Sequence, residues 1–161
     1  MTNNLTVEDY NHEHKGTCTE LFIKVYSAEP FNFSWLDWEK ADRYLTDIEN
    51  SPNSQGFVLK ENDCIVGVCL GQRENHFMNV GYKINEFFIE PDHQHMGLGS
   101  HFLEQVENRL RDSEVKIMTL FTQRHMDSFN FYQKHDYVPS EETVHMSKLI
   151  RQEAPLETVE V

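Results

Sequence analysis

The residues best suited to chemistry are two glycines, Gly97 and Gly99, in the segment "QHMGLG". Glycines at this spacing allow a tight turn whose backbone N–H groups point into one concavity. If a helix follows, its N-terminal amides and the positive end of its dipole add to the attraction for an anion. Such a turn binds phosphate groups without a basic side chain. A tight turn that serves only packing would use the same glycines, so the motif needs support from its surroundings.

The spacing of the glycines argues against the best-known nucleotide-binding loops. Written from Gln94, the segment has the form Q-x-x-G-x-G, which differs from the dinucleotide fingerprint G-x-G-x-x-G. It also lacks the Lys and the Ser or Thr of a Walker loop. Nicotinamide cofactors and nucleoside triphosphates are therefore disfavoured as ligands.

The elements on either side of the glycines are a strand and a helix. Residues 80–90 are rich in β-formers and stop before Pro91, which removes a backbone donor. After the glycines, apolar residues recur at helical spacing, namely Leu98, Phe102, Leu103, Val106 and Leu110. The glycines therefore lie at a strand-to-helix turn.

The whole chain predicts an α/β fold in the order β, α, α, a three-stranded meander, α, β, α, β. Beyond the two elements above, we expect strands around 5–7 and at 56–60, 64–72, 115–121 and 143–150, and helices around 21–25, 38–48 and 127–135. In the second of these helices, Trp38 shares a face with Ala41 and Leu45, so we expect it in the core. Asp127 is the expected N-cap of the last helix.

Size and charge narrow the class of protein. At 161 residues the chain is long enough for one domain, which we place at 1–150, followed by an acidic and flexible tail at 151–161. Asp and Glu outnumber Lys and Arg by 27 to 14, which disfavours nucleic acid and anionic membranes and favours basic partners. The first residues have no basic start and no apolar run, and nowhere do eighteen apolar residues follow one another, so we expect a soluble, cytoplasmic protein.

The cysteines and histidines suggest neither a disulfide framework nor a metal site. Cys18, Cys64 and Cys69 form no C-x-x-C pair and leave one cysteine over. His93 and His95 flank Gln94, but no further ligand is specified beside them. We expect reduced thiols and no metal.

In this setting the glycine segment resembles the motif R/Q-x-x-G-x-G/A of the GCN5-related N-acetyltransferase (GNAT) superfamily. The resemblance in element order covers residues 5–150 and implies a mixed sheet with a central splayed strand pair flanked by helices. It also implies acetyl-coenzyme A (acetyl-CoA) as co-substrate, with the pyrophosphate on backbone amides of Gln94, His95, Met96, Gly97, Leu98, Gly99 and Ser100. The pantetheine arm would pair, like an added strand, with Phe87, Phe88 and Ile89.

A second match lies downstream, where "FNFYQKHDYV" is similar to the superfamily's A-x-x-F-Y-x-K-x-G-F. The resemblance places Tyr132 beside the thioester sulfur, where its hydroxyl would protonate the departing thiolate. The chain departs from the pattern in four places. Ser128 replaces alanine, Asp136 replaces glycine, Tyr137 replaces phenylalanine, and His125 stands where a coenzyme-contacting asparagine is common.

Transfer of an acetyl group to an amine requires a group that takes a proton, because an alkyl amine is mostly protonated at neutral pH. Glu86 is the candidate, since it lies on the strand before Pro91 and matches an acidic residue of many superfamily members; it would act as base or as anchor for the ammonium. An edge-strand charge facing solvent is the structural alternative. A backbone amide of this strand, at Phe88, would stabilise the oxyanion.

The acceptor is expected to meet the aromatic segment "EPFNFSWLDWEK". Its candidate substrate-binding residues are Glu29, Phe31, Phe33 and Trp35, which combine charge with cation–π contacts. We therefore predict direct transfer from acetyl-CoA to a primary amine of a small cationic acceptor, such as a polyamine or an aminoglycoside. A protein or peptide N-acetyltransferase and a non-catalytic acetyl-CoA sensor are the alternatives, and the resemblance makes a homodimer reasonable.

Overall fold

The computed structural model describes residues 4–150. The predicted acidic tail, residues 151–161, lies outside the described residues. The chain divides into two compact units with the boundary between Thr122 and Gln123. The first unit holds the sheet and three of the α-helices, and the second holds the last helix.

The elements follow the predicted order up to the last helix. The strands are β1 (Leu5–Asp9), β2 (Ser54–Glu61), β3 (Cys64–Asn75), β4 (Val80–Ile89) and β5 (Val115–Thr119). The helices are α1 (Lys15–Ser27), α2 (Trp38–Glu49), α3 (Leu98–Asp112) and α4 (Asp127–Lys134), with the 3-10 turns η1 (His12–His14) and η2 (Pro91–His93). The predicted α/β class is confirmed.

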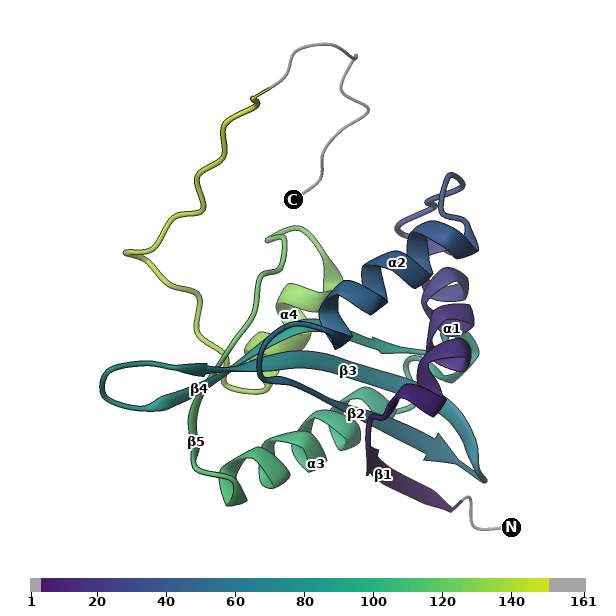
Figure 1. Cartoon of the computed structure of the whole chain (residues 1–161), viewed down its shortest axis with the longest axis horizontal. Helices are drawn as coiled ribbons and strands as arrows, with labels where there is room; N and C mark the ends of the chain where they lie inside the picture. Colours follow the sequence, from purple (N-terminus) through teal and green to yellow (C-terminus); the bar gives the residue numbers. More distant parts are fainter. Residues whose placement is uncertain (1–3, 151–161) are drawn as a thin grey trace. The chain divides into compact units, whose positions relative to one another are not determined.

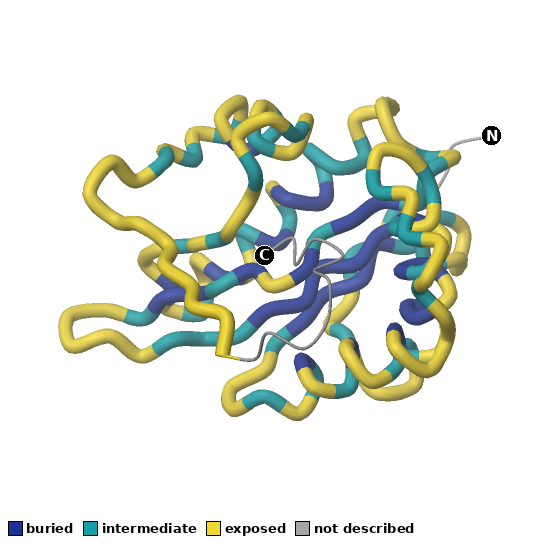
Figure 2. The backbone as a smooth tube through the Cα atoms, turned by 90° about the horizontal axis from the view of Figure 1, so that it is seen from above, coloured by how far each residue is buried: buried dark blue, intermediate teal, exposed yellow. Residues whose placement is uncertain are grey.

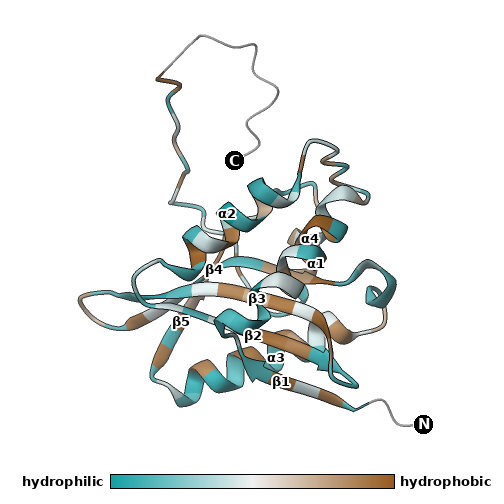
Figure 3. Ribbon diagram, turned by 45° about the vertical axis from the view of Figure 1, so that its right-hand side comes forward, coloured by the Kyte–Doolittle hydropathy of each residue, from teal (hydrophilic) through white to brown (hydrophobic). Residues whose placement is uncertain are grey.

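The sheet is mixed and its strands lie in the order β1-β2-β3-β4-β5. The first four strands form an antiparallel meander, and β5 joins β4 in parallel after the crossover through α3. Figure 1 shows α1 and α2 on one face of this sheet and α3 on the other. The hydrophobic residues of β2 and β3 run along the middle of the sheet in Figure 3, and the buried segments lie together in the interior in Figure 2. Both strands are buried in their middle residues.

Alternation along β4 supplies both layers of the core. Phe88 packs against Phe22 of α1, with ring centroids 5.8 Å apart. Phe87 points to the other face, where its ring stacks on Phe102 of α3 at 5.3 Å. Neighbouring residues of one strand therefore anchor helices on opposite faces, as the period of two requires.

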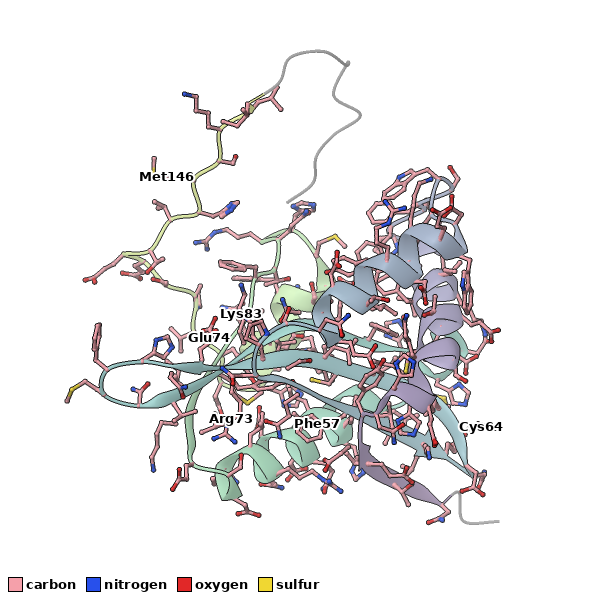
Figure 4. The ribbon with its side chains drawn as sticks, viewed as in Figure 1. Phe57, Cys64, Arg73, Glu74, Lys83 and Met146 are labelled. Atoms are coloured by element: carbon pink, nitrogen blue, oxygen red, sulfur yellow. The ribbon has the colours of Figure 1, made fainter. Side chains whose placement is uncertain are left out.

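Three details of the predicted elements are wrong. Residues 143–150 are not a strand: the described part of the second unit contains no other strand to pair with them, and Met146 projects from an extended segment in Figure 4. Trp38 is 47% exposed, because it is the first residue of α2 and the buried face of this helix begins at Ala41. The N-cap of α4 is Met126, and Asp127 is the first helical residue.

Candidate active site

The site is built where β4 separates from β5. Only the first part of β4, Val80 to Lys83, pairs with β5. From Ile84 to Ile89, β3 is the sole strand that pairs with β4 among residues 4–150. The first unit thus contains a splayed strand pair, and the second half of β4 presents one open edge to a ligand.

A β-bulge lies at the point of separation. Ile84 pairs with Gly71 and Glu86 pairs with Leu70, so Asn85 has no counterpart on β3. A bulge changes the direction of the side chains that follow it. Here it precedes Glu86, whose side chain points to the face that α1 and α2 cover.

The register of β4 decides which backbone amides face the open edge. The amide of Glu90 donates to the carbonyl of Val66 at 2.8 Å, so Glu90 faces β3. Backbone groups alternate in direction along an antiparallel pair. Phe88 therefore also faces β3, whereas Phe87 and Ile89 face the open edge. The expected oxyanion donor, the Phe88 amide, is turned away from this edge, and the Phe87 amide replaces it as the candidate.

The turn from Gln94 to Ser100 joins this edge to α3. Gln94 donates from Nε2 to the carbonyl of Ile89 at 2.9 Å, which ties the turn to the end of β4. His95 adopts φ 60°, and Gly97 adopts φ 81° as the N-cap of α3. Gly97 offers no side-chain oxygen to the first turn of the helix. The turn therefore leaves an exposed backbone surface at a helix N-terminus, the arrangement that suits an anion.

Glycine is needed at position 97 for its backbone angle. A Cβ at Gly97 would meet no atom within 4 Å, so space is not the constraint. The left-handed conformation costs other residues free energy, and glycine adopts it freely. His95, Met96 and Gly97 are exposed, while Leu98, Gly99 and Ser100 are partly buried in the first turn of α3.

Glu86 is a buried carboxylate with a hydrogen bond to each oxygen. The hydroxyl of Tyr26 donates to Oε2 at 2.6 Å, and the hydroxyl of Tyr44 donates to Oε1 at 2.5 Å. Only 8% of the residue's surface is exposed, so the solvent-facing alternative is wrong for this residue. The two tyrosines come from α1 and α2, and Glu86 therefore joins both helices to β4.

Burial dominates the electrostatics of this group. Burial raises the pKa of Glu86, and the hydrogen bonds from Tyr26 and Tyr44 oppose that shift. Burial also raises the pKa of Tyr44, and the charge of Glu86 adds to the effect, so this tyrosine remains a hydroxyl donor at neutral pH. A carboxylate with a raised pKa is a stronger base than an ordinary one and gains from a cationic partner.

Tyr26 and Tyr44 are functional candidates that the sequence did not indicate. Tyr26 follows Phe22 by one helical turn, so its place beside the sheet could have been inferred from the α1 periodicity. Nothing in the sequence pairs either tyrosine with Glu86, since 60 and 42 residues separate them from it along the chain. Their role depends on how two helices pack on one strand.

The aromatic segment lies beside Tyr26. The ring of Tyr26 lies 4.7 Å from Phe31 and 6.0 Å from Phe33, and Phe33 stacks on Trp35 at 5.2 Å. Phe31 and Phe33 are partly buried, Trp35 is 56% exposed, and Glu29 is exposed. A row of aromatic rings thus leads from the surface to the tyrosine that holds Glu86.

The second unit contains the other predicted site residues. Tyr132 is buried in α4, with its ring 5.2 Å from Phe131 and 5.3 Å from Tyr137. His125 lies in the exposed turn before the helix. Asp136 has φ 64° just after the helix, a left-handed angle that glycine adopts freely and that aspartate tolerates.

Comparison with known families identifies this arrangement. The model of the Acetyltransferase (GNAT) family matches residues 18–137, which is most of the chain. The chain belongs to the GNAT acetyltransferase family. It is an acetyl-CoA-dependent N-acetyltransferase, and no curated protein matches its sequence closely enough to name the acceptor.

Solved GNAT structures share the fold at low sequence identity. An aminoglycoside acetyltransferase, meta-AAC0020 from an uncultured soil metagenomic sample, in complex with sisomicin, is 17% identical, with a TM-score of 0.70 over 91% of this chain and 97% of the other. Aminoglycoside N-acetyltransferase AAC(6')-Iy in complex with CoA is 12% identical, with a TM-score of 0.70 over 92% and 97%. Ribosomal-protein-alanine N-acetyltransferase from Brucella melitensis is 7% identical, with a TM-score of 0.72 over 91% and 99%.

Cys69 lies on β3 beside the open half of β4 in this GNAT site. It pairs with Phe87 across the sheet, but it is buried, and burial raises the pKa of its thiol to about 12. It is therefore a poor nucleophile at neutral pH. Cys64 is exposed at the turn between β2 and β3 (Figure 4).

Residues 4–150 contain no group of three or more His, Cys, Asp or Glu that could hold a metal ion, and no helix among them is long and apolar enough to span a membrane.

Proposed function

We propose that this enzyme transfers the acetyl group of acetyl-CoA directly to a primary amine of a small cationic molecule, within a ternary complex. The observation that carries the proposal is the Glu86 carboxylate, which is buried beside the open edge of β4 and held by two tyrosine hydroxyls. A buried charge is costly unless it is paired with an opposite charge as well as hydrogen-bonded. An ammonium group of the acceptor would be such a partner.

The residues of the first unit fit the co-substrate. The exposed turn from Gln94 to Gly97 and the start of α3 would hold the pyrophosphate through backbone amides. Phe87 and Ile89 would pair with the pantetheine arm along the open edge of β4. The partial negative charge that develops on the carbonyl oxygen would meet the amide of Phe87.

Glu86 and Tyr132 would divide the proton transfers. Glu86 accepts a proton from the acceptor nitrogen, directly or through water, and leaves the lone pair free to attack the thioester carbon. As the new C–N bond forms and the C–S bond breaks, the electron pair of the C–S bond stays on sulfur. The hydroxyl of Tyr132 gives its proton to this thiolate, and the tyrosine recovers a proton from solvent. The nitrogen, which is cationic after the attack, releases its second proton to solvent to become the amide, and Glu86 releases the proton it accepted before the next cycle.

The acceptor class follows from charge and from the aromatic segment. The chain carries a formal net charge of −13, which attracts cations. Phe31, Phe33 and Trp35 form a cluster of rings that would bind a cationic amine through cation–π contacts, and Glu29 adds an exposed carboxylate. Tyr26 connects these rings to Glu86. This combination favours a polyamine, an aminoglycoside or a similar basic amine.

A thiol-release assay with acetyl-CoA tests the proposal. The panel contains polyamines, aminoglycosides, amino acids and basic peptides, each with the native protein and with Glu86→Gln. We expect release with a small cationic amine and a loss of about 10²-fold in kcat/KM in the variant, the lower range for a positioned base. Release only with peptides would favour a protein or peptide N-acetyltransferase. Binding of acetyl-CoA without release for any amine would favour a sensor.

We also propose a cytoplasmic homodimer that binds neither nucleic acid nor membranes, with residues 1–150 as the catalytic domain. The cysteines are free thiols, which suits a reducing compartment. The acidic charge opposes binding to polyanions. Light scattering after gel filtration would give the oligomeric state directly.

A further inference from the structure

The turn that leads into the coenzyme-binding segment is fixed by a histidine between two carboxylates. His93 is the last residue of η2, directly before Gln94. Its Nε2 donates to Oε2 of Glu61 at 3.1 Å, and its Nδ1 lies in close contact with Oε2 of Glu90 without the alignment of a hydrogen bond. Glu61 ends β2 and Glu90 follows β4, so the ring links two strands that lie on either side of β3.

A lysine of α1 also binds the carboxylates at this turn. Lys24 in the last turn of α1 donates to Oε1 of Glu90 at 2.6 Å and to Oδ2 of Asp92 at 2.8 Å. Lys24 and His93 therefore occupy both oxygens of Glu90. The turn is tied to α1, β2 and β4 through side chains, in addition to the bond from the His93 amide to the carbonyl of Glu90.

This network has two effects on the segment that follows it. It restricts the position of Gln94, whose side chain bonds the end of β4, and thus of the exposed turn up to Gly97. It also places cationic and N–H groups beside Glu61, Glu90 and Asp92, three carboxylates that would otherwise repel a pyrophosphate nearby. Both effects would act on coenzyme binding, and neither would reach the groups that transfer the acetyl group or the protons.

We infer that His93 is a positioning residue for coenzyme binding, which orders the pyrophosphate turn by linking Glu61 to Glu90. The inference depends on the coenzyme site given under the proposed function. It does not depend on the identity of the acceptor. His93 would not contact the reacting atoms. Its removal should weaken coenzyme binding and leave the chemical step almost unchanged.

The test measures CoA affinity by calorimetry in the native protein, His93→Ala, His93→Gln and Glu61→Gln, beside thermal unfolding of each. We expect Kd for CoA to rise about tenfold in His93→Ala and by less in His93→Gln, which keeps one N–H donor for Glu61. Glu61→Gln keeps a side-chain oxygen that can accept from His93 and removes one carboxylate near the turn, so Kd should change less than in His93→Ala. The control is His12→Ala, because His12 also pairs with a glutamate, Glu49, and lies far along the chain from the turn.

Kinetics with any accepted amine give the second measurement. In His93→Ala, KM for acetyl-CoA should rise in step with Kd, and kcat should change less than twofold. An unchanged Kd in a folded His93→Ala variant would overturn the inference, as would an equal effect of His12→Ala. Since CoA binding needs no acceptor, the effect of His93→Ala on Kd could still be interpreted if the acceptor hypothesis failed. Failure of the native protein to bind CoA would contradict the proposed function instead.

Discussion

The hydroxyl of Tyr44 and the carboxylate of Glu86 are joined by a hydrogen bond of 2.5 Å between α2 and β4. With the matching bond from Tyr26, it makes a buried acid the meeting point of two helices and a strand. The same contact therefore bears on stability and on catalysis. Changes at the tyrosines can separate the two.

Tyr44→Phe leaves Oε1 of Glu86 buried without its donor. We expect a loss of about 1–3 kcal/mol in the free energy of unfolding, the range for an unsatisfied buried polar group. Tyr10→Phe is the matched control, because the Tyr10 hydroxyl is buried and has no hydrogen-bond partner, so its removal should be neutral or stabilising. Urea denaturation at pH 7 measures both. Equal losses in the two variants would mean that the bond to Glu86 contributes nothing specific.

The ionisation of Glu86 should make stability fall as pH rises. Burial raises its pKa in the folded protein above the ordinary value of 4.5, which applies to the unfolded chain. Between these two pKa values the folded state binds more protons, so the free energy of unfolding decreases with increasing pH. We expect the stability difference between native protein and Glu86→Gln to favour the native protein most below about pH 4.5 and to decline above it. A difference that grows with pH would show a lowered pKa instead.

The same raised pKa shapes activity if Glu86 is the base. The acid limb of kcat/KM should lie above the range of an ordinary glutamate, because the base works only when ionised. Tyr44→Phe removes a hydrogen bond that lowers this pKa and should shift the limb to higher pH. A pH profile of the native enzyme and this variant, with one accepted amine, gives both values. A limb that stays in place after the change would assign it to another group.

Tyr132→Phe should slow turnover without abolishing it. A thiolate leaves tolerably well unaided, so we expect kcat to fall about tenfold, less than the ~10²-fold typical of a positioned acid. CoA affinity should remain, since the ring still packs on Phe131 and Tyr137. Tyr137→Phe, which restores the residue common in the family, is the control and should keep kcat. If Tyr132→Phe has native kcat, the thiolate takes its proton elsewhere.

Much of the site could be predicted where its cause is local. The left-handed angle at Gly97 is a property of one residue type, and the period of two along β4 follows from its apolar residues. The hydrogen bonds from Tyr26 and Tyr44 to Glu86 could not be predicted, because they require two helices to pack on a strand that is distant in sequence. For residues 143–150 the sequence predicted a strand that the structure does not contain. Apolar alternation indicates a strand only where another strand can pair with it.

A pair of glycine substitutions tests the importance of backbone conformation at the coenzyme turn. Gly97→Ala places a Cβ on a residue with φ 81°, at a cost of about 1–2 kcal/mol in the free energy of unfolding. Gly16→Ala, in α1, meets no atom within 4 Å and has no positive φ, so it should be neutral or stabilise by up to about 1 kcal/mol. The space at Gly97 is open, so the change should act through the angle rather than through a clash.

The coenzyme affinity of the same two variants shows what the turn does. If the left-handed angle at Gly97 directs the first amides of α3 toward the pyrophosphate, Gly97→Ala should raise Kd for CoA, and Gly16→Ala should leave it unchanged. Denaturation and calorimetry on the two proteins separate stability from binding. A stability loss in Gly97→Ala with native CoA affinity would mean that the turn serves helix packing alone, the alternative that its glycines left open.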